Sequence, residues 1–211
     1  MYSKVNTATV YGIDSKMISV EADISDGMPM FEMVGYLSSE VKEAKERVRA
    51  ALKNEGYALP VKRITVNLSP ANLRKTGSGF DLPIAVAILA SIGVIDKNML
   101  ENVCIFGEIS LDGKIQRING VLPMVLEAQK NNLKYCIVPE ENINEANLVP
   151  DMKVIGVKKL SDVVSIFQWD ELEKSVCSDA SNDTNSQEYI EQEESQYDFS
   201  MISGQTELRR A

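Results

Sequence analysis

One continuous stretch, residues 63–90, constrains the fold more than any other part of the chain. It reads RITVNLSPANLRKTGSGFDLPIAVAILA. The alternating, β-branched start predicts a buried strand over residues 63–68, and the apolar end predicts a core helix over 81–92. Asp81 stands where a helix N-cap is expected, and Pro83 lies in the first turn. A strand, a glycine-rich loop and a helix N-terminus in this order commonly build a site for an anion or a catalytic group.

The rest of the chain up to about residue 169 alternates strands with helices. Further strands are predicted at 6–14 and 17–24 (joined by a turn at 12–16), 30–35, 103–111, 114–118, 134–138 and 153–157, and further helices at 39–54, 121–131, 140–148 and 160–169. Ser38 or Ser39 is the expected cap of the helix at 39–54, whose mixed Lys, Arg and Glu residues we interpret as a solvated face rather than a binding face. We therefore expect an α/β fold in which helices sandwich a mixed sheet.

Charge and composition divide the chain unevenly. Of the net charge of −9, all lies between residues 170 and 200, which hold ten acidic residues and one basic residue, whereas the remainder has 21 of each sign. We expect a folded domain at 1–169, an acidic disordered linker at 170–196, and at 197–211 the start of a further module that is cut short. A neutral domain neither supports nor forbids contact with nucleic acid.

Composition also excludes several classes of site. The chain has no histidine, which rules out histidine-based zinc sites and Ser-His-Asp triads. Its cysteines, Cys104, Cys136 and Cys177, form no CxxC pair and favour a reducing cytosol. Residues 82–95, the longest apolar run, are too short to cross a membrane and predict a core helix. With no signal-peptide pattern at the start, we expect a cytoplasmic protein with no membrane partner.

The loop between the strand and the helix is the candidate site. Its residues of interest are Arg74, Lys75, Gly77, Ser78, Gly79 and Asp81. The Walker A pattern of a P-loop is absent, so we favour a structural role for the glycines. The sharper alternative is that Arg74 and Lys75 contact a phosphate backbone, a nucleotide or a neighbouring subunit. No metal-ligand spacing is visible.

Two further interpretations of this region stay open. Ser78 with a lysine would make a Ser-Lys dyad, but Lys75 lies too close in what we expect to be an exposed loop, and spacing does not select Lys114 or Lys130. Glu108 is either an exposed strand residue or a buried carboxylate that contacts the glycine loop, and we favour the first.

Several motifs in order resemble a known family. VKEAKERVRAAL, RITVNLSPANLRKTGSGFDLPIA and FGEISLDGKIQRINGVLPMVLEAQ are similar to the N-terminal domain of the magnesium chelatase-like AAA+ ATPases of the YifB/ComM group, over residues 1 to about 168. The closing YDFSMISGQTELRRA is similar to the segment ahead of the family's Walker A loop, so we expect a chain truncated just before that motif. One departure is VGYLS at 34–38, where the family usually has VGLP.

The resemblance implies a fold similar to the Lon protease domain and to a domain of a small-subunit ribosomal protein. Aligned on Lon, Gly79 and Leu122 occupy the positions of the catalytic serine and lysine, so the resemblance implies that the peptidase chemistry is lost. The family's chemistry is ATP hydrolysis with magnesium in a hexameric AAA+ ring, and ComM members act in DNA branch migration.

From the resemblance we expect no catalytic residue and no cofactor in this chain. It would be an accessory domain whose partners are its own AAA+ module, further copies in a hexamer and, as a candidate, DNA. The alternatives are a residual peptidase that uses Ser78 and a pure oligomerisation module.

Overall fold

The computed structural model describes residues 1–168. The large sheet consists of β1 (Tyr2–Tyr11), β2 (Asp14–Ser25), β3 (Met30–Val34), β4 (Arg63–Ser69), β5 (Val103–Ile105), β8 (Tyr135–Pro139) and β9 (Lys153–Val157), and a small sheet pairs β6 (Glu108–Ile109) with β7 (Ile115–Gln116). The helices are α1 (Ser39–Asn54), α2 (Asp81–Ser91), α3 (Val121–Lys130), α4 (Ile143–Ala146) and α5 (Leu160–Gln168), with 3₁₀ turns at Lys97–Leu100 and Glu140–Asn142. The predicted linker at 170–196 and the predicted module start at 197–211 lie outside the described residues.

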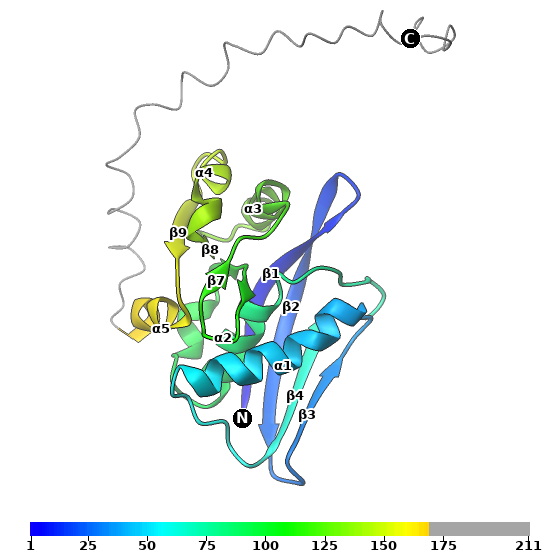
Figure 1. Ribbon diagram of the computed structural model, residues 1–211. Coiled ribbons are helices and arrows are strands. Elements are labelled where there is room, and N and C mark those ends of the chain that lie inside the picture. Colours follow the sequence, from blue (N-terminus) through cyan, green and yellow to red (C-terminus); the bar gives the residue numbers. More distant parts are fainter. Residues whose placement is uncertain (169–211) are drawn as a thin grey trace, which may run out of the picture. The chain divides into compact units, whose positions relative to one another are not determined.

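The large sheet is mixed, with the strand order β3-β4-β2-β1-β5-β8-β9 (Figure 1). β1 pairs antiparallel with β2, and β2 pairs antiparallel with β4. Four pairs are parallel: β3 with β4, β1 with β5, β5 with β8, and β8 with β9. The predicted α/β fold with a mixed sheet is therefore confirmed.

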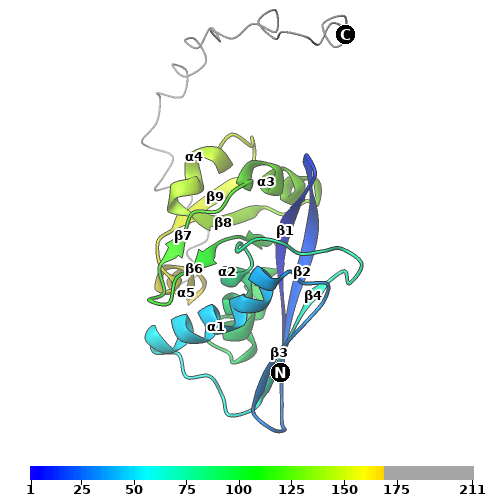
Figure 2. The same ribbon diagram turned by 45° about the vertical axis from the view of Figure 1, so that its right-hand side comes forward.

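Helices cover both faces of this sheet because its strands bury side chains alternately on either side. On β5 and β8, Ile105 and Ile137 belong to one hydrophobic cluster, whereas Cys104 and Cys136 belong to the other. The first cluster includes the buried faces of α1, α2 and α5, and the second includes those of α3 and α4. Figures 1 and 2 show α1 crossing over α2.

Helix α2 is the central helix of the first cluster. All eleven of its residues are buried, as the apolar run predicted. Its polar groups are matched by the sheet: the Ser91 hydroxyl donates to the Ala22 carbonyl over 3.0 Å, and the Ser3 hydroxyl donates to the Ala87 carbonyl over 2.6 Å. The C-terminal half of α2 is thus held against β1 and β2.

Several predicted strand boundaries are wrong. β1 begins at Tyr2 rather than at residue 6, and β7 covers only Ile115–Gln116 of the strand predicted at 114–118. The turn between β1 and β2 comprises only Gly12 and Ile13, because the strands keep pairing up to Tyr11 and Asp14, and Ile13 at the tip is 95% exposed. The single strand predicted at 103–111 is broken at Gly107, whose φ is +156°. Beyond that break β6 leaves the large sheet and forms a hairpin with β7 through the predicted Asp112-Gly113 turn.

Candidate functional site

The glycine loop, residues 74–80, leads from β4 into α2 and is anchored through Lys75. The Lys75 N–H donates to the Tyr36 carbonyl over 2.9 Å, and the Ser38 N–H donates to the Lys75 carbonyl over 3.0 Å. The Lys75 side chain is fully buried, and its ammonium donates to the Pro70 carbonyl. Burial lowers the pKa of this amine. The expectation that Lys75 is exposed is therefore wrong: pairing with residues 36–38 places it inside the protein.

Arg74 is the exposed cation of the glycine loop. Within residues 1–168 it makes no ion pair with a carboxylate. Thr76 and Gly77 are also exposed, and Gly77 takes a left-handed conformation with φ of +84°. Of the two residues predicted to contact a partner, only Arg74 presents its charge to solvent, and its contact with DNA or a subunit stays a prediction.

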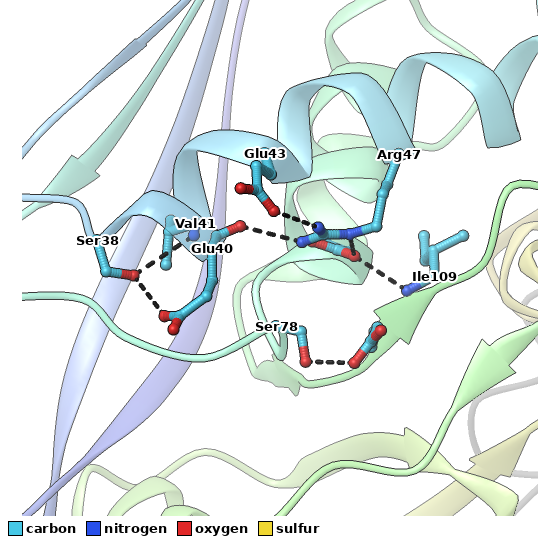
Figure 3. Close-up of polar contacts among 9 residues, drawn as sticks. Ser38, Glu40, Val41, Glu43, Arg47, Ser78 and Ile109 are labelled. Atoms are coloured by element: carbon cyan, nitrogen blue, oxygen red, sulfur yellow. Dashed lines mark hydrogen bonds and ion pairs between the residues drawn. The ribbon is translucent and has the colours of Figure 1, made fainter.

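Ser78 binds a carboxylate from another element. Its hydroxyl donates to Glu108 Oε2 on β6 (Figure 3), thirty residues further along the chain. Both residues are partly buried. The interpretation of Glu108 as a plain exposed strand residue is therefore wrong, because the break at Gly107 turns β6 toward the glycine loop. The bond holds the middle of the loop against the β6–β7 hairpin.

Asp81 and Arg47 form a two-pronged ion pair next to this bond. Arg47 on α1 donates from Nε to Asp81 Oδ2 over 2.7 Å and from Nη2 to Oδ1 over 2.9 Å. The Ile109 N–H also donates to Oδ2, over 3.3 Å. Figure 3 shows the Arg47 side chain extending from α1, with Glu43 of the same helix beside its guanidinium. Three elements, α1, α2 and β6, thus meet at one buried carboxylate.

This ion pair overturns two predictions. Asp81 does not cap α2: Phe80 occupies the N-cap position without a side-chain cap bond, because the Asp81 carboxylate faces Arg47 and Ile109 instead. Arg47 likewise does not belong to a fully solvated helix face, since its side chain is only 23% exposed. Burial raises the pKa of the Asp81 carboxyl, and the bond from Arg47 opposes that rise.

A cavity of about 370 Å³ opens beside the glycine loop. Three segments line it: residues 8–10 at the end of β1, residues 76–80 of the loop, and residues 118–120 with Met124 at the start of α3. Its lining contains the apolar side chains Val10, Ile118 and Met124 and no ionisable residue. The volume falls within the range of small-ligand sites.

Gly79 and Leu122, predicted to replace a catalytic serine and lysine, lie in different parts of the structure. Gly79 lines the cavity, and a Cβ there would lie 3.2 Å from Ile118 Cδ1. Leu122 is partly buried and packs against the second hydrophobic cluster, while its N–H donates to Glu145 Oε1 over 3.0 Å. Neither side chain has a proton to transfer, and the loss of peptidase chemistry stays a prediction.

The lysines considered as partners for Ser78 are engaged or exposed elsewhere. Lys75 donates to Pro70, Lys114 pairs with Asp112 over 2.9 Å on the exposed hairpin, and Lys130 is exposed at the end of α3.

Residues 1–168 contain no group of three acidic, cysteine or histidine side chains placed to hold a metal. In the same part of the chain, no helix combines the length and apolar character needed to span a bilayer.

Sequence reasoning missed Arg47, and it ranked the two interpretations of Glu108 wrongly. One signal for Arg47 was available: an aspartate that opens an otherwise apolar helix requires a cationic partner if it is buried. Arg47 directly precedes the buried Val48 on α1, at the margin of the apolar stripe. For Glu108 the only signal was the adjacent Gly107, which marks a possible strand break.

Comparisons with known proteins agree with this architecture. Residues 20–142 match the family described as subunit ChlI of Mg-chelatase. The chain is 41% identical over 160 residues to competence protein ComM of Haemophilus influenzae, a match that covers 76% of this chain and 31% of that protein. It is 41% identical over 147 residues to the uncharacterized protein YifB of Escherichia coli, covering 70% and 29%. The chain thus spans about a third of the length of these relatives.

A more distant similarity accounts for the fold. The chain is 22% identical over 174 residues to the Lon protease of Trichlorobacter lovleyi, which covers 77% of this chain and 21% of that protein. The mixed seven-strand sheet and this similarity confirm the expected Lon-domain-like fold. On the match over residues 20–142 and the relatives ComM and YifB, the chain belongs to the family of Mg-chelatase ChlI-like proteins.

Proposed function

We propose that residues 1–168 form a non-catalytic accessory domain of a Mg-chelatase-like AAA+ ATPase that acts on DNA during natural transformation. The observation that carries this is the internal use of the loop's polar groups. Ser78 binds Glu108, Asp81 binds Arg47 and Lys75 binds Pro70. A glycine loop tied down in this way is a rigid scaffold rather than a reactive centre. The name of the relative ComM supports the link to competence.

The activity of the whole protein would come from parts that this chain does not span. We assign ATP and magnesium, which the family resemblance implies, to the AAA+ module of such a protein, together with assembly into a hexamer in the cytoplasm. Residues 1–168 would contribute a platform for that ring, and Arg74 is our candidate contact for a DNA phosphate or a neighbouring subunit.

A chimaera tests the role in transformation. The matching region of Haemophilus influenzae ComM would be replaced by residues 1–168 of this chain and expressed in a strain without ComM. We expect transformation to recover, and a stably expressed chimaera that leaves transformation at the deletion level would contradict the proposal. Arg74→Ala in the chimaera tests the contact residue, with the exposed Arg49→Ala as the matched control.

DNA contact by the domain itself is a separate measurement. The chain and its Arg74→Ala variant would be titrated with labelled single- and double-stranded DNA at low salt, where phosphate contacts are strongest. We expect weaker binding only for Arg74→Ala and not for Arg49→Ala. Equal binding by all three proteins, or none, would remove the DNA role of Arg74.

The two alternatives have their own tests. A residual peptidase would require an activated Ser78, but the Ser78 hydroxyl donates to a carboxylate and the Lys75 ammonium donates to the Pro70 carbonyl. Labelling of Ser78 by a fluorophosphonate probe would support the peptidase alternative. For a pure oligomerisation module, light scattering on the chain should show a stable assembly, and a monomer would argue against it.

A further inference from the structure

The cavity beside the glycine loop has polar groups that the proposed function does not use. The N–H groups of Gly77, Ser78 and Gly79 on one side donate to no acceptor within residues 1–168. On the other side the same holds for Asn119 and Gly120, which precede α3. The neighbouring N–H groups of Ile118 and Leu122 are satisfied by Asn142 and Glu145. Five residues that line the cavity thus have N–H groups without an acceptor in the described part of the chain.

The Thr9 side chain gives a second, independent indication of a ligand. Thr9 on β1 lines the cavity, is only 4% exposed, and its hydroxyl has no hydrogen-bond partner in the described part of the chain. Its oxygen is not among the fully enclosed polar atoms without a partner, which belong to Thr7, Ser15 and Ser19, so it keeps access to the cavity, where water or a ligand satisfies such a group. Residues of β1, of the glycine loop and of the approach to α3 that carry these donors thus line one space of about 370 Å³.

The charge and polarity of the residues that line the cavity indicate the class of ligand. The cavity lies at the N-termini of α2 and α3, whose dipoles favour a negative charge. No lysine or arginine lines it, so it lacks the cations that usually hold phosphate dianions. The remaining wall is apolar, formed by Val10, Ile118 and Met124. A monoanion with a short apolar group matches both parts of this surface better than a nucleotide does.

Glu108 does not oppose such a ligand directly. Its carboxylate accepts the Ser78 hydroxyl, it is not among the lining residues, and it lies within electrostatic range of the Arg47 guanidinium. Ser78 therefore offers the cavity its N–H while its side chain is engaged elsewhere.

We propose that this cavity binds a carboxylate that carries a short branched apolar group. The carboxylate accepts from the N–H groups of the glycine loop and of residues 119–120 and from the Thr9 hydroxyl, and the apolar group packs against Val10, Ile118 and Met124. Two sources share this chemistry, namely the C-terminal residue of a peptide and a free branched-chain acid. No bond is made or broken, and the inference does not depend on a role in transformation.

The test is a nitrogen-15 NMR titration of the full 211-residue chain. The probes are acetyl-leucine, its C-terminal amide, 4-methylpentanoate and inorganic phosphate. We expect acetyl-leucine to shift the amide signals of Gly77, Ser78, Gly79 and Gly120, with the amide binding at least about tenfold more weakly because the charged acceptor is lost. Comparable shifts with 4-methylpentanoate would identify a free acid as sufficient, and their absence would identify the peptide end.

Variants locate the binding. Val10 lines the cavity and is 40% exposed, so Val10→Trp should fill the cavity and abolish the shifts. Ile13→Trp places the same side chain on the same hairpin outside the cavity and should leave binding unchanged. Thr9→Val should weaken it by about tenfold. Equal binding of acid and amide, preference for phosphate, binding that survives Val10→Trp, or no saturable shift up to about 20 mM acetyl-leucine would each overturn the assignment.

Discussion

Arg47 on α1 and Asp81 at the first position of α2 share two hydrogen bonds, of 2.7 and 2.9 Å, and the Asp81 side chain is fully buried. The pair joins two of the helices that cover one face of the sheet, at the point where α2 follows the glycine loop. Its energetic importance lies mainly in the cost of breaking it, because either group alone would be an unpaired charge beneath the surface.

Arg47→Met is therefore expected to lower the free energy of unfolding by about 3–5 kcal/mol, since it leaves the Asp81 carboxylate without its partner. The double variant Arg47→Met/Asp81→Leu should lose less than Arg47→Met alone. Urea unfolding of both variants measures this coupling. Lys62→Met, which breaks the surface pair with the 91% exposed Asp26, should leave the free energy of unfolding nearly unchanged, because solvent screens that pair. A loss for Arg47→Met as small as that of Lys62→Met would contradict the prediction.

Lys75 should make stability depend on pH in the alkaline range. Burial lowers the pKa of its amine in the folded state below the ordinary value of about 10.4. Between the folded pKa and that value the unfolded chain binds more protons, so the free energy of unfolding rises with pH. Lys75→Met lacks the titrating group, and the wild-type chain should gain stability relative to it as pH increases toward about 10.4.

Urea unfolding of both proteins from neutral pH to about pH 10.5 tests the expected slope. Lys75→Arg is the matched control, because a guanidinium keeps its charge throughout this range and should show no such gain. A wild-type curve that falls relative to Lys75→Met would reverse the sign and refute the assignment.

The Ser78–Glu108 bond should control the mobility of the glycine loop. Ser78→Ala removes the hydroxyl donor and leaves the Glu108 carboxylate without that partner, which should cost about 1–2 kcal/mol. Hydrogen exchange at the amides of Asp81 and Gly107, which donate to the loop carbonyls of Ser78 and Gly79, should then become about tenfold faster. Ser165→Ala removes an exposed hydroxyl that bonds within α5, and it should leave these amides unaffected. Unchanged exchange in Ser78→Ala would show that the loop is held by its backbone bonds alone.

Gly107 should tolerate no side chain. A Cβ at this position would lie 3.1 Å from both Ile115 Cγ2 and Leu82 Cδ2, and the residue adopts a φ of +156°. Its N–H donates to the Gly79 carbonyl over 3.1 Å, and its carbonyl accepts from Leu82 over 2.9 Å. Gly107→Ala should therefore cost about 2–3 kcal/mol in thermal or urea unfolding.

Gly77→Ala is the matched control for this substitution. Its φ is also positive, at +84°, but a Cβ there would meet no atom within 4 Å. A loss of about 1 kcal/mol from backbone strain is expected. An equal decrease in the free energy of unfolding for the two variants would mean that Ile115 and Leu82 move aside without an energetic penalty.

Local sequence patterns predicted the elements well where capping and periodicity agree. Helix α1 begins after Ser38, whose hydroxyl accepts from the Val41 N–H as expected of an N-cap. The buried positions of α1, including Val41 and Val48, follow the predicted apolar spacing. For α2 the uniform apolar run predicted burial on all sides, because a helix without a polar face fits only inside the protein.

The site was harder to predict because its contacts join residues distant in the chain. Asp81 matched the preferences of an N-cap, but the same carboxylate is also the partner that a nearby arginine requires, and the ion pair prevailed. Burial of Lys75 depends on backbone pairing with residues 36–38, which no periodicity within the loop encodes. The Ser78–Glu108 contact similarly depends on the strand break at Gly107.

The strand order means that β1 gains its two neighbours in the sheet at very different times during synthesis. Its antiparallel partner β2 follows immediately, whereas its parallel partner β5 begins only at Val103. While the ribosome makes the intervening residues, one side of β1 lacks its neighbour, and main-chain groups so exposed readily pair with other chains. A shortened polypeptide that stops before Val103 lacks β5, so this strand edge stays unpaired. Expression of the N-terminal half alone should therefore give aggregates rather than a soluble half-domain.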